Sequence, residues 1–202
     1  FYATHPQSYY RTGKANPDFP GMARNQTEPL IGIPLIHFNG AGGNITAGKY
    51  NDGKPDKRQL LADRLAGGML RAWQSTKKVA VGSESVELKT EAVLLPPGES
   101  IVPKELNGDY EAAKSKLQAM LHNSLDTPYR YAIANHLVFL QRYINKQPID
   151  VSMLRIGNAC ILSLPGELFI EYQLAAQKLR PDAFVCMAAY GEYSPFYIGT
   201  SI

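Results

Sequence analysis

The sequence predicts a mixed α/β fold built as one domain from layered mixed sheets and flanking helices. Three observations lead to this prediction. Of 202 residues, 45% are hydrophobic and 19% are charged, which is the balance of a globular chain rather than a disordered one. Segments with helical spacing are interleaved with segments typical of strands, and no internal repeat is present. We therefore expect residues 1–202 to form a single domain, with residues 96–103 as the only plausible seam.

The first part of the chain contains two expected strands around one short helix. Residues 1–5 are typical of the end of a strand, and residues 19–26 leave room for a short helix. Residues 31–38 (IGIPLIHF) form a continuous apolar run, which predicts a strand that is buried on both faces. This run leads directly into a glycine-rich turn at residues 39–48.

A long amphipathic helix is expected next. Asp56 can cap its N-terminus and Gln59 occupies the capping-box position. Leu61, Leu65 and Met69 continue a stripe at helical spacing that ends near residue 76. Alternating apolar residues at 86–92 then predict a half-buried strand, which ends at the Pro-Pro-Gly of residues 96–98.

The second half of the chain reads as two helices followed by an α/β segment. Residues 103–121 and 128–146 are expected to be helical. Residues 151–156 and 159–164 predict a hairpin through Gly157 and Asn158. A helix at 167–179 and a buried strand at 183–189 follow, and the strand continues into an aromatic stretch at 190–197.

Charge and cysteine content exclude several classes of function. The net charge of +3, from 21 basic and 18 acidic residues, is too small and too dispersed to indicate a nucleic-acid partner. No apolar run approaches the roughly 20 residues that span a bilayer, so no transmembrane segment is expected. Two cysteines do not make a disulfide framework. The chain opens at Phe1 without a methionine and closes on sequence typical of mid-element, so we expect a piece of a longer polypeptide.

The glycine-rich turn allows three interpretations. Residues 43–50 (GNITAGKY) nearly spell a phosphate-binding P-loop, but Tyr50 stands where that motif needs a small hydroxyl residue. Pro55 also disfavours the helix that should follow at once. Phosphate binding is the weakest of the three interpretations. The others are a flexible strand-to-helix turn and a backbone shaped around a substrate.

Candidate ligands and acids are scattered along the chain. None of the four histidines belongs to a local zinc motif, so any metal site must be assembled from distant segments. Glu167 follows a Pro-Gly between an expected strand and an expected helix. A carboxylate there either complements the helix macrodipole or points into the crevice at a strand end, and its position alone does not decide between the two.

Taken in order, five elements resemble the neutral/alkaline (non-lysosomal) ceramidase family, the zinc-dependent amidases that cleave the N-acyl bond of sphingolipids. Residues 3–8 (ATHPQS) are similar to the family's AxHGTSM element, and residues 16–23 (NPDFPGMA) to its SSDNKGYA stretch. Residues 43–48 (GNITAG) fall where the family has NxGDVSPN. Residues 164–167 (LPGE) resemble its PGE, and residues 193–198 (YSPFYI) fall where it has YSGY. The middle of the chain, roughly residues 80–150, carries none of the resemblance.

The resemblance implies a zinc site made from two histidines, a glutamate and a tyrosine. His5 matches the second histidine, Glu167 the glutamate and Tyr197 the tyrosine, while the first histidine belongs to a segment upstream of this chain. The family's catalytic serine corresponds to Thr46, which keeps a hydroxyl. Backbone amides of the turn at Gly43 and Asn44 would support the substrate oxyanion.

The resemblance also implies an activity and leaves two alternatives. The expected function is hydrolysis of an N-acyl amide bond, in a ceramide-like lipid or a related substrate, by metal-activated water. Asn44 and Thr46 depart from the family's aspartate and serine, which favours another N-acyl or ester substrate as much as ceramide itself. The alternatives are a non-catalytic degenerate homologue that binds a ligand in the same cleft, and the P-loop-like phosphate binder. The expected partner is a small-molecule or lipid substrate, which could lie at a membrane surface, and the family is commonly exported.

Overall fold

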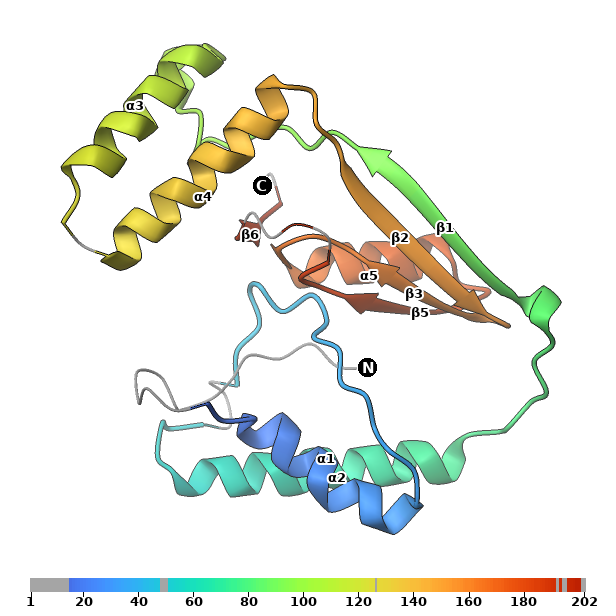
Figure 1. The fold of residues 1–202 in the computed structure, drawn as a ribbon. Helices are drawn as coiled ribbons and strands as arrows, with labels where there is room; N and C mark the ends of the chain where they lie inside the picture. The colour runs from blue at the N-terminus through green and yellow to red at the C-terminus, as the bar shows by residue number, and fades with distance from the viewer. Residues whose placement is uncertain (1–14, 48–50, 126, 192, 194–195, 201–202) are drawn as a thin grey trace.

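The computed structural model describes residues 15–47, 51–125, 127–191, 193 and 196–200, and it confirms the mixed α/β architecture (Figure 1). The described elements form a four-stranded sheet with one covering helix, a helix pair at each side of it, and a small two-stranded sheet. The chain exposes 13008 Å² of surface, whereas a compact monomer of 22.3 kDa exposes roughly 9,400 Å². These groups of elements therefore leave much of their surface open.

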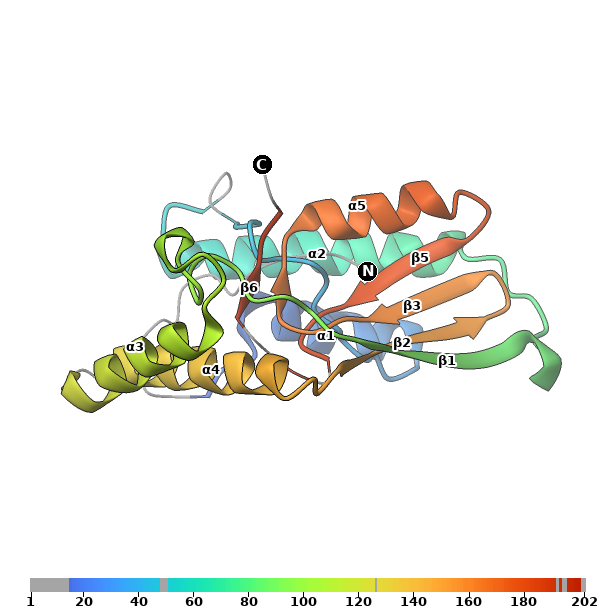
Figure 2. The same cartoon turned by 90° about the horizontal axis from the view of Figure 1, so that it is seen from above.

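The main sheet has the strand order β1-β2-β3-β5. The strands β1 (Val86–Val93), β2 (Ile149–Ile156) and β3 (Ala159–Ser163) are antiparallel, and β5 (Phe184–Ala188) pairs in parallel with β3. The expected hairpin through Gly157 and Asn158 is confirmed, and Gly157 takes a positive φ of 59°. The helix α5 (Ile170–Leu179) lies between β3 and β5 in sequence and covers one face of the sheet (Figures 1 and 2).

The helices α3 (Tyr110–Asn123) and α4 (Thr127–Ile144) pack as an antiparallel pair. Their core contains Leu117, Ile133 and Leu140, and Ile101 of the preceding loop packs into it. The helix expected at 103–121 is divided: Lys104–Leu106 forms a short 3₁₀-helix, and α3 begins at residue 110. Asn107 and Gly108 both have positive φ, which no α-helix accommodates.

The helices α1 (Asp18–Ile31) and α2 (Asp56–Ser75) form the second pair, and α2 begins where expected. Phe19, Leu61 and Ala62 are buried between them, and the buried side chains of Asp18 and Arg58 approach each other at 4.0 Å. The helix α1 is longer than the expected 19–26. It ends at Gly32, whose φ of 72° is the left-handed conformation that closes many helices.

The prediction of a buried strand at residues 31–38 is wrong. Residues 33–38 form no strand, and the side chain of Ile36 is 82% exposed. The backbone N–H of Leu35 donates to the side chain of Glu28 at 2.8 Å, and the segment reaches the main sheet through the N–H of Ala189, which donates to the carbonyl of Asn39 at 2.8 Å. An apolar run is not a strand without a ladder of backbone hydrogen bonds, so His37 lies in an extended loop instead of a buried strand.

Candidate functional site

The small sheet brings two of the expected metal ligands together. The strand β4 (Glu167–Leu168) pairs in parallel with β6 (Tyr197–Ile198), and Glu167 is the register partner of Tyr197. The backbone N–H of Glu167 donates to the carbonyl of Phe196 at 2.8 Å. Because side chains alternate between the faces of a sheet, register partners on neighbouring strands project from the same face. Glu167 is half-buried and Tyr197 is 59% exposed.

The Pro-Gly turn before Glu167 explains why this pairing forms. Gly166 has a φ of 66°, donates its N–H to the carbonyl of Tyr193 at 3.1 Å, and accepts from the N–H of Tyr190 at 3.1 Å. These bonds hold the turn against the aromatic stretch that follows β5. Residues 167–169, which the sequence analysis placed in a helix, are therefore extended, and α5 begins at residue 170.

The glycine-rich turn lies directly on β4. The N–H of Gly43 donates to the carbonyl of Leu168 at 2.8 Å. A side chain at position 43 would place its Cβ 2.5 Å from the carbonyl oxygen of Glu167 and 3.0 Å from that of Leu168. Only glycine allows the two backbones to approach this closely, so residue 43 fixes the turn against the backbone of Glu167 and Leu168.

Asn44 joins the same turn to the helix α5. Its side-chain Oδ1 accepts a hydrogen bond from the N–H of Ile170 at 2.9 Å, and its Nδ2 donates to the carboxylate of Glu171 at 2.9 Å. The side-chain amide thus satisfies an N–H in the first turn of α5. Because the side chain of Asn44 is hydrogen-bonded to Ile170 and Glu171, its backbone N–H is the group that Asn44 can offer to a substrate.

The two remaining expected site residues are Thr46 and His5. Thr46 lies two residues further along the turn and is exposed, and its neighbour Ala47 packs against the cluster formed by α1 and α2. His5 lies outside the described residues. The structure therefore brings together Gly43, Asn44, Glu167 and Tyr197. The metal-binding and catalytic roles of these four residues, of Thr46 and of His5 stay predictions.

A cleft of about 550 Å³ opens beside Tyr197. Its lining includes Phe196 and Tyr197 of the small-sheet region, His136 and Phe139 of α4, and Tyr172 of α5. The lining is mainly apolar and aromatic, and the volume lies within the roughly 300–1,000 Å³ typical of small-molecule sites.

His136 is the titratable imidazole of this cleft and was not among the site residues expected from the sequence. Its ring lies edge-on to that of Phe196, with 5.9 Å between the ring centroids. Burial lowers the pKa of His136, which favours the neutral imidazole near pH 7. The only signal in the sequence was a histidine near the apolar stripe of a helix, which is equally typical of a core residue.

Glu167 and Tyr197 offer a carboxylate and a phenol oxygen on one face, which are suitable donors for zinc when nitrogen ligands complete the set. Within the described residues, no group of three or more His, Cys, Asp and Glu side chains is gathered where it could hold a metal ion. The residues present therefore fit part of a zinc site, and the nitrogen ligands must come from other segments.

The P-loop interpretation lacks the geometry that it needs. Residues 51–55 separate the glycine-rich turn from α2, and Pro55 occupies the N-cap of that helix. The turn packs instead on β4 and the start of α5, where Asn44 and Glu171 already occupy the helix N-terminus.

In the part of the chain that is described, no helix is long and apolar enough to cross a membrane.

Comparison with known proteins gives two similar solved structures. No protein-family model and no curated protein matches the chain. The neutral ceramidase from Pseudomonas aeruginosa is similar with a TM-score of 0.57 and 14% identity, over 96% of this chain and 37% of that chain. A structure described as a ceramidase complexed with C2 is similar with a TM-score of 0.59 and 13% identity, over 98% of this chain and 39% of that chain. The fold is therefore ceramidase-like, and the chain spans less than two fifths of the length of these neighbours.

Proposed function

We propose that this chain carries part of the catalytic site of a ceramidase-type zinc hydrolase that cleaves an N-acyl amide bond. The observation that supports the proposal best is the β4–β6 register, which sets Glu167 beside Tyr197 under the glycine-rich turn. The same two residues match the glutamate and the tyrosine among the zinc ligands of the family that the sequence resembles. The ceramidase-like fold agrees with that resemblance.

In the proposed site, Glu167 and Tyr197 would hold the metal together with His5 and a second histidine. When bound, zinc would supply water activated near neutral pH and Lewis-acid polarisation of the scissile carbonyl. Gly43 keeps the turn pressed on β4, and its own N–H is already bonded to the carbonyl of Leu168 at 2.8 Å. Of the two expected amides, the backbone N–H of Asn44 is therefore the one that would support the negative charge on the substrate oxygen.

Thr46 is proposed to orient the attacking water or to donate its hydroxyl to the tetrahedral intermediate. The substitution Thr46→Val keeps the shape of the side chain and removes the hydroxyl. We expect kcat to fall by on the order of 10²–10³-fold with KM little changed, since this hydrogen bond forms mainly in the transition state. A folded, zinc-loaded Thr46→Val enzyme with wild-type kcat would remove Thr46 from the catalytic residues.

The test of the proposal is metal content and amidase activity of the full-length protein. The substitution Glu167→Gln removes one anionic ligand without changing the size of the side chain. We expect it to lower zinc affinity by at least tenfold and to abolish hydrolysis of short-chain N-acyl sphingosine and simpler N-acyl amines. Glu91→Gln makes the same change on an exposed residue of β1 and should retain both properties.

The alternative is a non-catalytic homologue that keeps the cleft for binding. It is favoured by the departures at Asn44 and Thr46 and by the commitment of the Asn44 side chain to α5. This alternative predicts that the full-length protein binds zinc or an N-acyl lipid but turns over no amide or ester. Full-length protein that neither binds zinc nor hydrolyses these substrates would contradict the catalytic proposal.

A further inference from the structure

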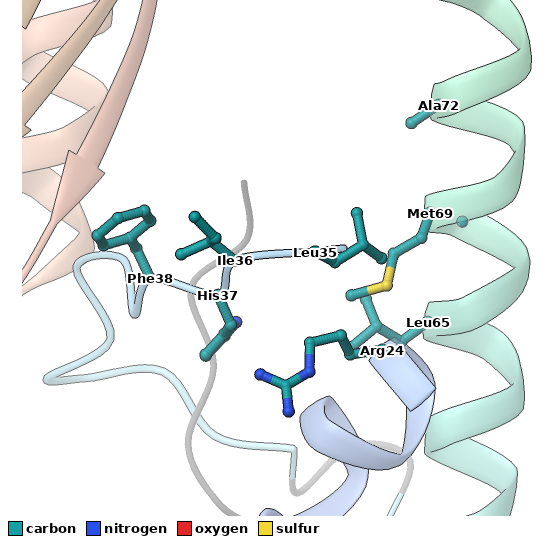
Figure 3. A pocket seen from close by; sticks show the side chains of 9 residues that line it. Arg24, Leu35, Ile36, His37, Phe38, Leu65, Met69 and Ala72 are labelled. Atoms are coloured by element: carbon teal, nitrogen blue, oxygen red, sulfur yellow. The ribbon is translucent and has the colours of Figure 1, made fainter. Parts of the chain in front are cut away.

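A second cavity lies between the helix pair α1–α2 and residues 35–38, and no residue of β4 or β6 lines it (Figure 3). Its volume is about 360 Å³. One wall is formed by Leu35, Ile36 and Phe38, and the other by the α2 face that carries Leu65 and Met69. Ile36 and Phe38 are 82% and 47% exposed, so two large apolar side chains stand uncovered at the mouth of the groove.

The groove is formed by defined contacts of the polypeptide. Gly32 ends α1 in the left-handed conformation and turns the chain back. Oε1 of Glu28 then accepts the N–H of Leu35 at 2.8 Å and holds the loop against the helix pair. On the side of the helices, Thr27 Oγ1 lies 3.8 Å from Sδ of Met69, which fixes the thioether at the α1–α2 contact.

One end of the groove is cationic. Figure 3 shows the guanidinium of Arg24 beside the ring of His37 at this end, while the apolar side chains line the rest. The Nε of Arg24 is buried and makes no hydrogen bond to the described residues. Nε forms a loose ion pair with Oε1 of Glu28 at 3.8 Å, which is beyond hydrogen-bond distance, and that oxygen already accepts from Leu35. The Arg24 side chain as a whole is 39% exposed. A guanidinium is a planar fork of donors that matches a carboxylate.

We propose that this groove binds a monocarboxylate with an unbranched apolar chain of medium length, its carboxylate on Arg24 and its chain between residues 35–38 and α2. The charge of Arg24 selects an anionic head, and the apolar walls select a hydrocarbon tail. The volume is at the lower end of the range for small-molecule sites, which suits a single chain better than a two-chain lipid. This proposal does not depend on the hydrolase site.

Gly68 provides a variant that blocks the groove without damaging the helix. It lines the groove on α2, and a Cβ built there meets only the end of the Arg71 side chain at 4.0 Å. Gly68→Leu fills the space and also replaces a poor helix former by a good one. Gly67→Leu is the matched control. Residue 67 does not line the groove, and a Cβ there meets the flexible end of Arg71 at 3.3 Å.

The experiment is calorimetric titration of the full-length protein with hexanoate, octanoate and decanoate below their micelle concentrations. We expect affinity to rise about fourfold for each methylene that enters the groove. Gly68→Leu should weaken decanoate binding by more than tenfold, Arg24→Gln by about tenfold, and Gly67→Leu by less than twofold. Decyltrimethylammonium, with the same chain and a cationic head, should bind at least tenfold more weakly than decanoate.

Three outcomes would overturn the proposal. They are the absence of decanoate binding, decanoate binding that Gly68→Leu leaves unchanged, and equal binding of the anionic and the cationic amphiphile. Arg64→Gln removes an exposed guanidinium of α2 and controls for the change in overall charge. Decanoate binding that persists in Glu167→Gln separates this groove from the proposed hydrolase site, because the two sites share no lining residue.

Discussion

Replacing Gly43 by alanine should damage stability and activity together, because this glycine is where the turn meets β4. The added Cβ would lie 2.5 Å from the carbonyl oxygen of Glu167 and 3.0 Å from that of Leu168, and neither backbone atom can move aside as a side chain could. Overpacking of this kind costs roughly 1–3 kcal/mol, and losing the Gly43 N–H bond to Leu168 costs roughly 0.5–1.5 kcal/mol. For a chain of this length, a total of about 2–4 kcal/mol lowers Tm by roughly 5–15 °C.

The assay for Gly43→Ala is thermal unfolding of the full-length protein by circular dichroism, together with amidase turnover per folded molecule. Gly98→Ala is the control, since a Cβ at residue 98 meets no atom within 4 Å and its φ is not in the left-handed region. Its Tm should stay within about 2 °C of wild type. If Gly43→Ala melts as wild type does, the close approach of the turn to β4 is wrong, and with it the placement of residues 43 and 44 in the site.

Three further predictions concern single residues. Asn44→Ala should destabilise the protein by about 1 kcal/mol in urea unfolding, because Ile170 loses a side-chain acceptor and Glu171 a donor; an unchanged midpoint would contradict this capping role. Burial lowers the pKa of His136 in the folded state, so its contribution to stability is complete above the unfolded pKa of about 6.5 and is lost as the pH falls through the lower folded value. The loss of stability between pH 7.5 and pH 5 should therefore be smaller in His136→Leu than in wild type. An equal loss in both proteins would refute the lowered pKa of His136. Burial raises the pKa of the Cys186 thiol to about 11, so thiol titration at pH 8 should show no rapid reaction of Cys186 until guanidinium unfolds the chain.

Local sequence signals predicted much of the fold. The start of α2 at residue 56 and the β2–β3 hairpin at Gly157 depend on capping and turn residues that act over a few positions. The apolar stripe of α2 and the alternation in β1 likewise predicted their elements. The predicted half-burial of β1 was wrong, because Val86 and Leu88 are 48% and 69% exposed. These elements are specified by nearby residues, so a single sequence suffices to find them.

Elements that depend on distant partners were not predictable in this way. Residues 31–38 have the composition of a buried strand, yet Leu35 bonds to Glu28 and the segment joins the sheet only near Asn39. The division before α3 depends on Asn107 adopting positive φ, which composition does not reveal. The strand β4 has two residues, and it exists because β6 pairs with it from a distant part of the sequence.

The candidate site shows the same division between local and distant information. Motif resemblance selected Glu167, Tyr197 and Gly43, but only the structure shows that the first two are register partners and that the third packs on their strand. Asn44 was expected to offer its backbone N–H to the substrate oxyanion, and only the structure shows that its side chain in addition caps α5. His136 was missed because the cleft is lined by α4 and by residues 196–199, two segments about sixty residues apart in sequence.

Anomalous diffraction at the zinc edge, from crystals of the full-length protein, would locate the metal itself. We expect one strong peak with a Glu167 oxygen, the Tyr197 phenol oxygen and a His5 nitrogen each at ~2.0–2.2 Å. The same peak should be absent from Glu167→Gln crystals and present in Glu91→Gln crystals. A peak coordinated by other residues, or wild-type crystals soaked in zinc that show no peak beside Glu167 and Tyr197, would contradict the assignment of this site.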